Sequence, residues 1–263
     1  MRKNFHAHTP RCGHAIGQET EYVQAAVDSN YDEFGFSDHT PWPGVYSPGM
    51  RMETKELPDY VEAVQTVKEA YKDKIKVYCG LECEYYPENT DWLKDTIEEY
   101  GLEYIILGNH FDFVENSGLY FGNCKTEYDV KRYLKTTIAA MATGIYNWLA
   151  HPDLYLKEYR KFDDTAKKTA REICYASRNL NIPLEYNLLG LFSTKAGYFR
   201  GLGYPYQAFW EIAAEEKCHV ILNVDAHDPK HVLNTALYDE GVANIKKLGL
   251  KMVNFTVDGF VEV

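Results

Sequence analysis

The sequence predicts an α/β fold in which parallel β-strands alternate with helices, in a single domain that spans residues 1–263. Short β-rich apolar runs alternate with amphipathic stretches along the whole chain, a pattern typical of repeated βα units. No linker rich in Pro, Gly or Ser, no internal repeat and no low-complexity stretch divides it. Seven or eight βα units in one domain predict either a barrel or a doubly wound sheet, which differ in whether the sheet closes.

Eight strands are expected, because β-branched, aromatic and other apolar residues gather in short runs between turn-forming residues. In chain order these strands cover residues 3–6, 34–37, 75–81, 104–107, 147–150, 183–186, 220–224 and 252–255.

Seven helices are expected between the strands, from amphipathic periodicity and from residues that start or stop helices. They cover residues 20–29, 57–71, 90–100, 127–143, 163–180, 206–216 and 235–248. Pro58 lies near a helix start, and Gly144 and Gly249 follow helix ends. The segment 181–183, which contains an Asn and a Pro, leads into a strand. Each of these positions is one where such residues favour an element boundary.

Composition narrows the classes of function. The formal net charge of -11 argues against a general nucleic-acid-binding protein, because phosphate backbones are bound by clustered Lys and Arg. A small-molecule substrate is therefore expected. The six cysteines form no Cys-x-x-Cys pair and are expected to be reduced, buried thiols. Since no apolar run is long enough to cross a membrane and residues 1–6 lack a signal-peptide core, the expected location is the cytoplasm.

Residue types that bind metals follow nearly every predicted strand, at the end where barrel enzymes have their active sites. A lone histidine is more often a hydrogen-bonded core or surface residue than a ligand. Packing alone does not explain why so many fall at equivalent strand ends, so the joint pattern favours a metal site. The ligand candidates are His6, His8, His14, His39, Glu82, His110, His151, Asp225 and His227.

Spacing adds a second argument for metal binding. His6 and His8, like Asp225 and His227, are two residues apart, which in an extended segment directs both side chains to one face. Glu82 is the candidate for bridging two ions, because its carboxylate has two oxygens. Mixed imidazole and carboxylate ligands favour zinc, manganese or iron over calcium or magnesium, and two to three divalent ions are expected.

Two further acids, Asp38 and Glu84, accompany this pattern. For each, the sequence leaves open a metal ligand, a group that orients a ligand, or a solvated acid. Asp38 is also a candidate proton donor, and metal-bound water is the alternative.

These residues resemble the motifs of the polymerase-and-histidinol-phosphatase (PHP) phosphoesterases, and within that family the stand-alone histidinol phosphatases. Residues 6–9 with 12–14 resemble the first motif, and residues 35–41 resemble the second. Segments 80–82, 151–153 and 225–227 are similar to later motifs in the same order, whereas 108–110 is one residue shorter than the corresponding motif of many relatives. The resemblance covers essentially the whole chain.

The resemblance implies a distorted seven-stranded (β/α) barrel, a TIM-like fold, with three metals. It implies three ligand sets: His6, His8, Glu82 and Asp225 for one ion; Glu82, His110 and His151 for a second; and His14, His39 and His227 for a third.

The implied activity is phosphomonoester hydrolysis, with L-histidinol phosphate as the expected substrate and a metal-bound hydroxide as the nucleophile. Arg160 and Arg200 are expected to bind the phosphate, the alternative being surface arginines paired with acids. Trp42, Asp112 and Phe113 are candidates for recognising the rest of the substrate. The other functions considered are a PHP phosphoesterase acting on another phosphorylated metabolite, nucleotide or phosphotyrosine, and a non-catalytic metal-binding protein. The sequence leaves the oligomeric state open.

Overall fold

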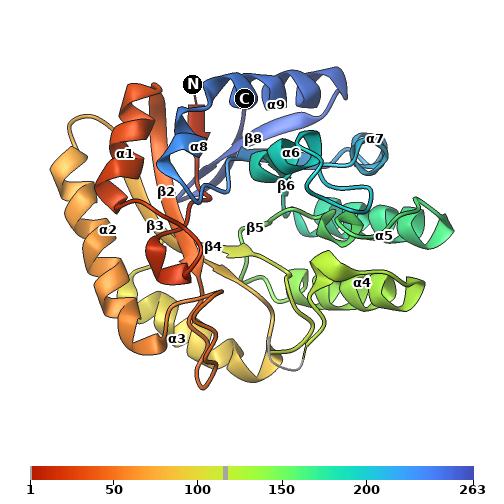
Figure 1. The fold of residues 1–263 in the computed structure, drawn as a ribbon, viewed down its shortest axis with the longest axis horizontal. Helices are drawn as coiled ribbons and strands as arrows, with labels where there is room; N and C mark the ends of the chain where they lie inside the picture. Colours follow the sequence, from red (N-terminus) through yellow and green to blue (C-terminus); the bar gives the residue numbers. More distant parts are fainter. Residues whose placement is uncertain (1, 115–117) are drawn as a thin grey trace.

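Parallel β-strands form the centre of the molecule and helices surround them (Figure 1), in a computed structural model that describes residues 2–114 and 118–263. The strands pair in sequence order within one sheet, all in parallel except the last pair. Their bounds are β1 (Arg2–Asn4), β2 (Tyr31–His39), β3 (Lys76–Cys83), β4 (Tyr104–Leu107), β5 (Trp148–Leu149), β6 (Leu184–Asn187), β7 (His219–Asn223), β8 (Lys251–Thr256) and β9 (Gly259–Glu262).

The sheet closes into a barrel between β1 and β7. Beyond the ends of these strands, Ala7 and Ala226 form a parallel bridge, in which His8 N donates to Ala226 O (2.8 Å) and Ala226 N donates to His6 O (3.0 Å). At the ends of the two strands, two buried asparagines join them through their side chains. Asn223 Oδ1 accepts from the Phe5 N–H, and Asn4 Oδ1 accepts from the Val224 N–H. The seven strands β1 to β7 thus form the distorted barrel that the resemblance implies.

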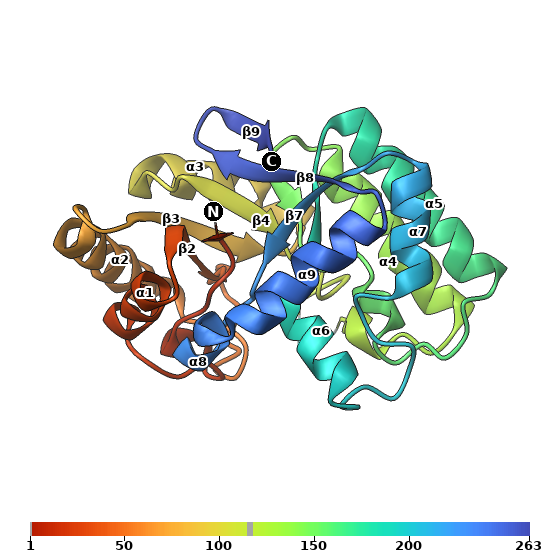
Figure 2. The same ribbon diagram turned by 90° about the horizontal axis from the view of Figure 1, so that it is seen from above.

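The eighth predicted strand lies outside this closed set. It is β8, which pairs with the start of β7 and forms an antiparallel hairpin with β9, a strand that was not predicted. Figure 2 shows this hairpin lying across the barrel strands. Its Phe255 packs in one cluster with Phe5, Tyr104 and Trp148 from barrel strands, and Phe260 packs against that cluster. The hairpin therefore contributes aromatic rings to the barrel interior.

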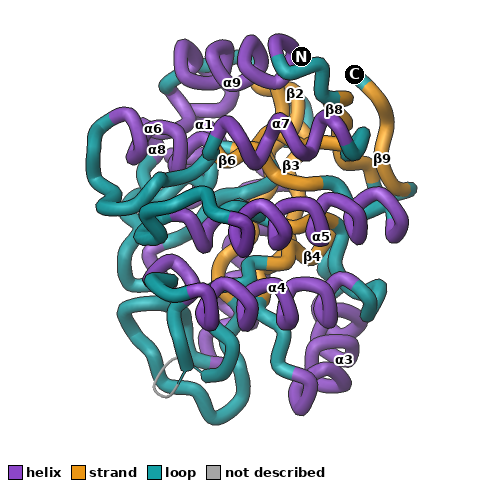
Figure 3. Tube along the Cα trace, turned by 90° about the vertical axis from the view of Figure 1, so that its right-hand side faces the viewer, coloured by secondary structure: helices purple, strands orange, loops and turns teal. Residues whose placement is uncertain are grey.

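Helices cover the outside of the barrel, and Figure 3 shows α4, α5, α7 and α9 side by side on one flank. Helices α2 and α3 have the predicted bounds, and the other predicted helices agree within a few residues. Helices α6 and α8, which follow β6 and β7, were not predicted. The bounds are α1 (Glu19–Asp28), α2 (Leu57–Tyr71), α3 (Thr90–Tyr100), α4 (Glu127–Met141), α5 (Asp164–Leu180), α6 (Leu188–Lys195), α7 (Gln207–Glu215), α8 (Pro229–Leu233) and α9 (Thr235–Lys247).

Among the described residues, no helix has both the length and the apolar character needed to cross a bilayer. The six cysteines are buried and unpaired, as expected.

Candidate metal centre

The nine predicted ligands converge on the carboxyl ends of the barrel strands. His39 ends β2 and Glu82 lies near the end of β3, while the others are on the segments that follow β1, β4, β5 and β7. His14 lies just beyond a short 3-10 helix, Pro10–Cys12. All the predicted ligands except His6 and His8 line one cavity of about 260 Å³, and His6 and His8 lie directly beneath it.

Four atoms form the first group: His6 Nε2, His8 Nε2, Glu82 Oε2 and Asp225 Oδ1. The distances between either imidazole nitrogen and either oxygen are 3.2–3.5 Å. Ligands at about 2.0–2.2 Å from a tetrahedral ion are separated by about 3.3–3.6 Å, so the arrangement has the dimensions of a metal site. Three of the four atoms are buried without a hydrogen-bond partner among the described residues: His6 Nε2, His8 Nε2 and Asp225 Oδ1. Because such atoms are costly to leave unpaired, their number here fits a divalent cation.

The second carboxylate oxygen of Glu82 faces another pair of histidines. Glu82 Oε1 lies 2.9 Å from His151 Nε2 and 3.4 Å from His110 Nε2. The two oxygens of Glu82 thus face two separate groups of nitrogens, as a bridging carboxylate requires. Gly108 makes room for this side chain, because a Cβ at that position would lie 2.3 Å from Glu82 Oε1.

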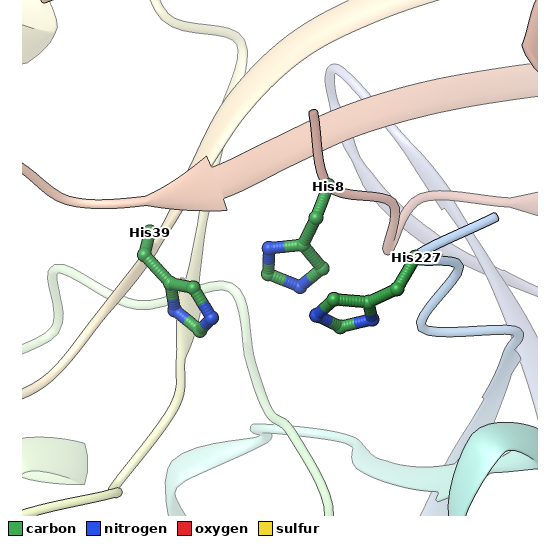
Figure 4. Close-up of side chains that lie close together, drawn as sticks. All are labelled: His8, His39 and His227. Atoms are coloured by element: carbon green, nitrogen blue, oxygen red, sulfur yellow. The ribbon is translucent and has the colours of Figure 1, made fainter. Parts of the chain in front are cut away.

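A third group of imidazoles lies beside the first. His14 Nε2 and His227 Nε2 are 3.1 Å apart, and His39 Nδ1 lies 3.2 Å from Glu82 Oε2. Figure 4 shows the ring of His8 between those of His39 and His227, whose centroids lie 4.3 and 4.2 Å from it. The structure thus brings together the three histidines that the resemblance assigns to a third ion.

Burial and neighbouring charges adjust the ionisation of these groups. Burial, reinforced by the charge on His8, lowers the pKa of His39 well below its usual value and that of His227 to about 3. Both rings are therefore neutral, the form in which imidazole binds metals. Burial alone would raise the pKa values of Glu82 and Asp225, but neighbouring histidines outweigh it and hold both well below the usual range. The carboxylates are therefore ionised.

Glu185 holds His6 from behind. Its carboxylate accepts from His6 Nδ1 at 2.9 and 3.0 Å, and it also accepts from Trp148 Nε1 and from the amides of Asn187 and Asn223. With Nδ1 bound in this way, the ring presents Nε2 to the first group.

Asp38 and Glu84 occupy comparable positions behind other histidines, and both are fully buried. Asp38 Oδ1 lies 3.5 Å from His8 Nδ1, while Asp38 Oδ2 accepts from Thr9. Glu84 Oε1 accepts from His110 Nδ1 at 3.0 Å and from the buried Arg51 at 2.9 Å. Burial opposes ionisation of Glu84, but Arg51 and His110 hold its pKa at about 2. Of the three readings that the sequence left open, this geometry corresponds to groups that orient ligands.

Two of the predicted ligands have unusual backbone conformations. His151 has a φ of 29° and Asp225 a φ of 58°, in the left-handed region that residues other than glycine rarely adopt. Such strain concentrates at functional sites, where the surrounding structure enforces it.

The remaining cavity wall consists of Met50, Tyr120, Leu154, Leu189 and Tyr204. Arg160 and Arg200 do not line the cavity; both are exposed, and neither forms an ion pair within residues 2–114 and 118–263. A larger cavity of about 510 Å³ lies between α7 and α9, but no histidine lines it. The ligand chemistry therefore identifies the smaller cavity as the candidate site.

The expectation that Trp42 contacts a substrate is wrong. Its ring is buried and its Nε1 donates to Glu84 Oε2 at 2.8 Å, so this tryptophan holds the carboxylate that contacts His110. Asp112 forms an ion pair with Arg132, and Phe113 is half exposed.

Several residues of the site were not found from the sequence. His231, which is not among the nine predicted ligands, accepts through Nδ1 from the backbone N–H of His227. Tyr120, Tyr204 and Arg51 are also missing from the predicted site. Arg51 and Tyr204 lie far along the chain from Glu84 and His151, the residues that they contact, and no local spacing identifies them. Tyr120 lies on the segment that pairs with Phe111, next to His110.

Comparison with known proteins points to one family. The model of the PHP domain matches residues 4–188. The probable histidinol-phosphatase of Deinococcus radiodurans is 27% identical, over 95% of each chain. The histidinol-phosphatase of Bacillus subtilis is 24% identical, over 86% of this chain and 94% of its own. A crystal structure of histidinol phosphate phosphatase from Lactococcus lactis, in complex with zinc, L-histidinol and phosphate, superposes with a TM-score of 0.75 at 20% identity, covering 99% of this chain and 98% of that one.

Proposed function

Because this chain belongs to the PHP domain family, we propose that it is a metal-dependent phosphatase that hydrolyses L-histidinol phosphate to L-histidinol and phosphate. The observation that carries the chemistry is the bridging position of Glu82 between two groups of histidines, beside buried nitrogens and an oxygen that have no other partner. The choice of substrate rests on four curated relatives, each of which is named as a histidinol-phosphatase or a probable one.

We propose two to three divalent ions of zinc, manganese or iron. The first ion would be held by His6, His8, Glu82 and Asp225, and a second by Glu82, His110 and His151. A third would be held by His14, His39 and His227. Bound ions of this kind supply a nucleophile from water at neutral pH and neutralise the charge of the phosphoryl group.

The chain's own contribution is to fix the ligands and to shape the cavity. Glu185 and Glu84 each accept a hydrogen bond from the Nδ1 of one imidazole, which fixes the ring and leaves Nε2 free, and Asp38 Oδ1 lies 3.5 Å from the Nδ1 of His8. Asp38 is enclosed by Thr9, His8 and His39, so we assign it the role of orienting His8. The cavity is open on one side, and a small phosphomonoester is the expected partner. A cytoplasmic location stays a prediction from the sequence.

The substrate assignment predicts a strong preference among phosphate esters. The protein loaded with manganese or zinc should cleave histidinol phosphate with a kcat/KM at least about a hundredfold above that for p-nitrophenyl phosphate, which corresponds to roughly 2.7 kcal/mol of transition-state binding. Steady-state kinetics on a panel of phosphorylated metabolites measures this. If another metabolite is cleaved best, only the metallophosphatase assignment survives, and absence of turnover on every ester would favour a metal-binding protein.

Arg160 and Arg200 remain our candidates for phosphate binding, because both lie on loops at the carboxyl side of the barrel. Replacing either with Ala should lower kcat/KM by roughly tenfold or more, the effect of losing a hydrogen bond to a charged group. Metal content should not change. Arg171→Ala is the matched control, because this exposed arginine pairs with Glu215 and Glu216 on the outer surface. If Arg160→Ala and Arg200→Ala behave like this control, the arginines do not bind phosphate.

A further inference from the structure

The cavity wall contains two polar groups besides the proposed metal ligands, the hydroxyls of Tyr120 and Tyr204. The other non-ligand residues of the wall are Met50, Leu154 and Leu189, and no lysine or arginine is among them. Arg160 and Arg200 lie outside this wall, so within the wall the two tyrosines are the side chains, besides the proposed ligands, that can donate a hydrogen bond to a substrate phosphate.

Tyr204 is the more firmly held of the two. Its side chain is largely buried, at 8% exposure, and its ring stacks on Phe199 with centroids 5.2 Å apart and an interplanar angle of 14°. The edge of α6 presses against the same ring, since a Cβ at Gly190 would lie 2.3 Å from Tyr204 Cε2. The ring also meets His151 edge to face, at 6.0 Å. These contacts fix the ring beside a proposed ligand of the second ion.

The Tyr204 hydroxyl has no hydrogen-bond partner among the described residues, although its backbone carbonyl accepts from Thr194. Several other buried tyrosines of the chain differ in this respect, although the enclosed Tyr31 hydroxyl also lacks a partner among the described residues. The hydroxyls of Tyr60, Tyr104, Tyr133 and Tyr155 each donate to a backbone carbonyl at 2.8–2.9 Å. The Tyr204 oxygen is not one of the enclosed side-chain atoms that lack a partner, so it is accessible from the cavity that Tyr204 lines. A tyrosine hydroxyl that is held in place at the cavity surface and bonded to no other described residue is available to donate to a substrate.

We propose that the Tyr204 hydroxyl donates a hydrogen bond to a nonbridging oxygen of the phosphoryl group, which makes Tyr204 a catalytic residue of the proposed phosphatase. The proposal rests on the proposed function. A hydroxyl suits this position because it is a directional donor that adds no charge beside the histidines. Since the ring is already immobile, the hydrogen bond costs little conformational entropy and acts as a preorganised donor in the transition state.

Tyr204→Phe tests this proposal, because it removes the hydroxyl and keeps the ring contacts. The matched control is Tyr155→Phe, whose hydroxyl donates to Ala166 O outside the cavity. Both variants and the wild type would be loaded with manganese or zinc. The measurements are metal content, melting temperature, affinity for inorganic phosphate by titration calorimetry, and kcat/KM for a phosphate ester.

The two variants should show opposite patterns. Tyr204→Phe should weaken phosphate binding and lower kcat/KM, each by roughly tenfold or more, with unchanged metal content and an unchanged melting temperature, because no protein hydrogen bond is lost. Tyr155→Phe should melt about 2–4 °C lower, since it loses a buried hydrogen bond, and should bind phosphate like the wild type.

Phosphate affinity and kcat/KM within twofold of wild type in Tyr204→Phe would overturn the proposal. Loss of metal from Tyr204→Phe would also overturn it if excess metal restored both the metal content and the activity. The hydroxyl would then support the metal site instead of binding the phosphate. These outcomes differ from failure of the proposed function, in which the loaded wild type itself neither cleaves phosphate esters nor binds inorganic phosphate.

Discussion

Glu82→Gln is expected to abolish turnover, lowering kcat/KM by at least roughly a thousandfold, or about 4 kcal/mol of transition-state stabilisation. The two oxygens of Glu82 face His6 and His8 on one side and His110 and His151 on the other. Glutamine keeps the shape of the side chain, but it loses the negative charge and replaces one oxygen with an amide nitrogen that cannot bind a cation. Kinetics with metal-saturated protein measures the loss.

The variant should stay folded, which circular dichroism and a cooperative thermal transition verify. Glu103→Gln is a matched control, because Glu103 precedes β4 at the opposite end of the barrel and pairs with Lys68. It should keep its activity. Near-normal turnover in folded Glu82→Gln would remove Glu82 from the bridging role.

Removal of metal is expected to have the second large effect. Elemental analysis of protein purified without chelators should find two to three transition-metal ions per chain. A chelator should eliminate turnover and lower the melting temperature by at least about 8 °C. Ions present at about a thousand times their Kd stabilise a fold by about 4 kcal/mol, and each kcal/mol shifts the melting temperature by about 2–4 °C in a chain of this size.

The physical cause lies in the atoms that lose their partner. His6 Nε2, His8 Nε2 and Asp225 Oδ1 are buried and have no other hydrogen-bond partner among the described residues, so they destabilise the metal-free fold. Adding manganese or zinc back should restore both activity and melting temperature. At most one ion per chain under replete conditions would contradict the proposed cluster.

Much of the fold was predictable because its signals are local. Helices α2 and α3 match the prediction at both ends, since their periodicity and boundary residues agree. Helix α6 was missed because Leu188–Lys195 follows its strand without a break, and its apolar residues and Gly190 lack the length of a helical pattern. Strand β9 was missed because none of its four residues is fully buried and it pairs only with β8.

Closure of the barrel depended on information that no local pattern contains. Strand β1 is shorter than predicted, because the asparagine side chains of Asn4 and Asn223 replace part of the backbone pairing. The expected strand 3–6 therefore becomes a segment held largely by contacts with the other end of the chain.

For the site, the residue types that meet at the strand ends were predictable, because parallel strands carry their carboxyl ends to one face. The roles of the groups behind them were not. Glu84 is held by Arg51, which lies 33 residues earlier in a loop, and a buried ion pair of this kind is visible only in three dimensions. The same holds for the strained backbone of His151 and Asp225, and for Tyr204, which approaches from the segment between α6 and α7.

The barrel closes where β1 meets β7, and this junction, here called the seam, determines when the protein can acquire its ions. His6 and His8 lie on one side of the seam and Asp225 lies on the other, so an ion held by all three cross-links the two ends of the barrel. During synthesis the two histidines are incorporated more than two hundred residues before the aspartate. Complete loading of this position must therefore follow synthesis of the last barrel strand, and the ion then closes a loop of over two hundred residues whose ends would otherwise be free to separate.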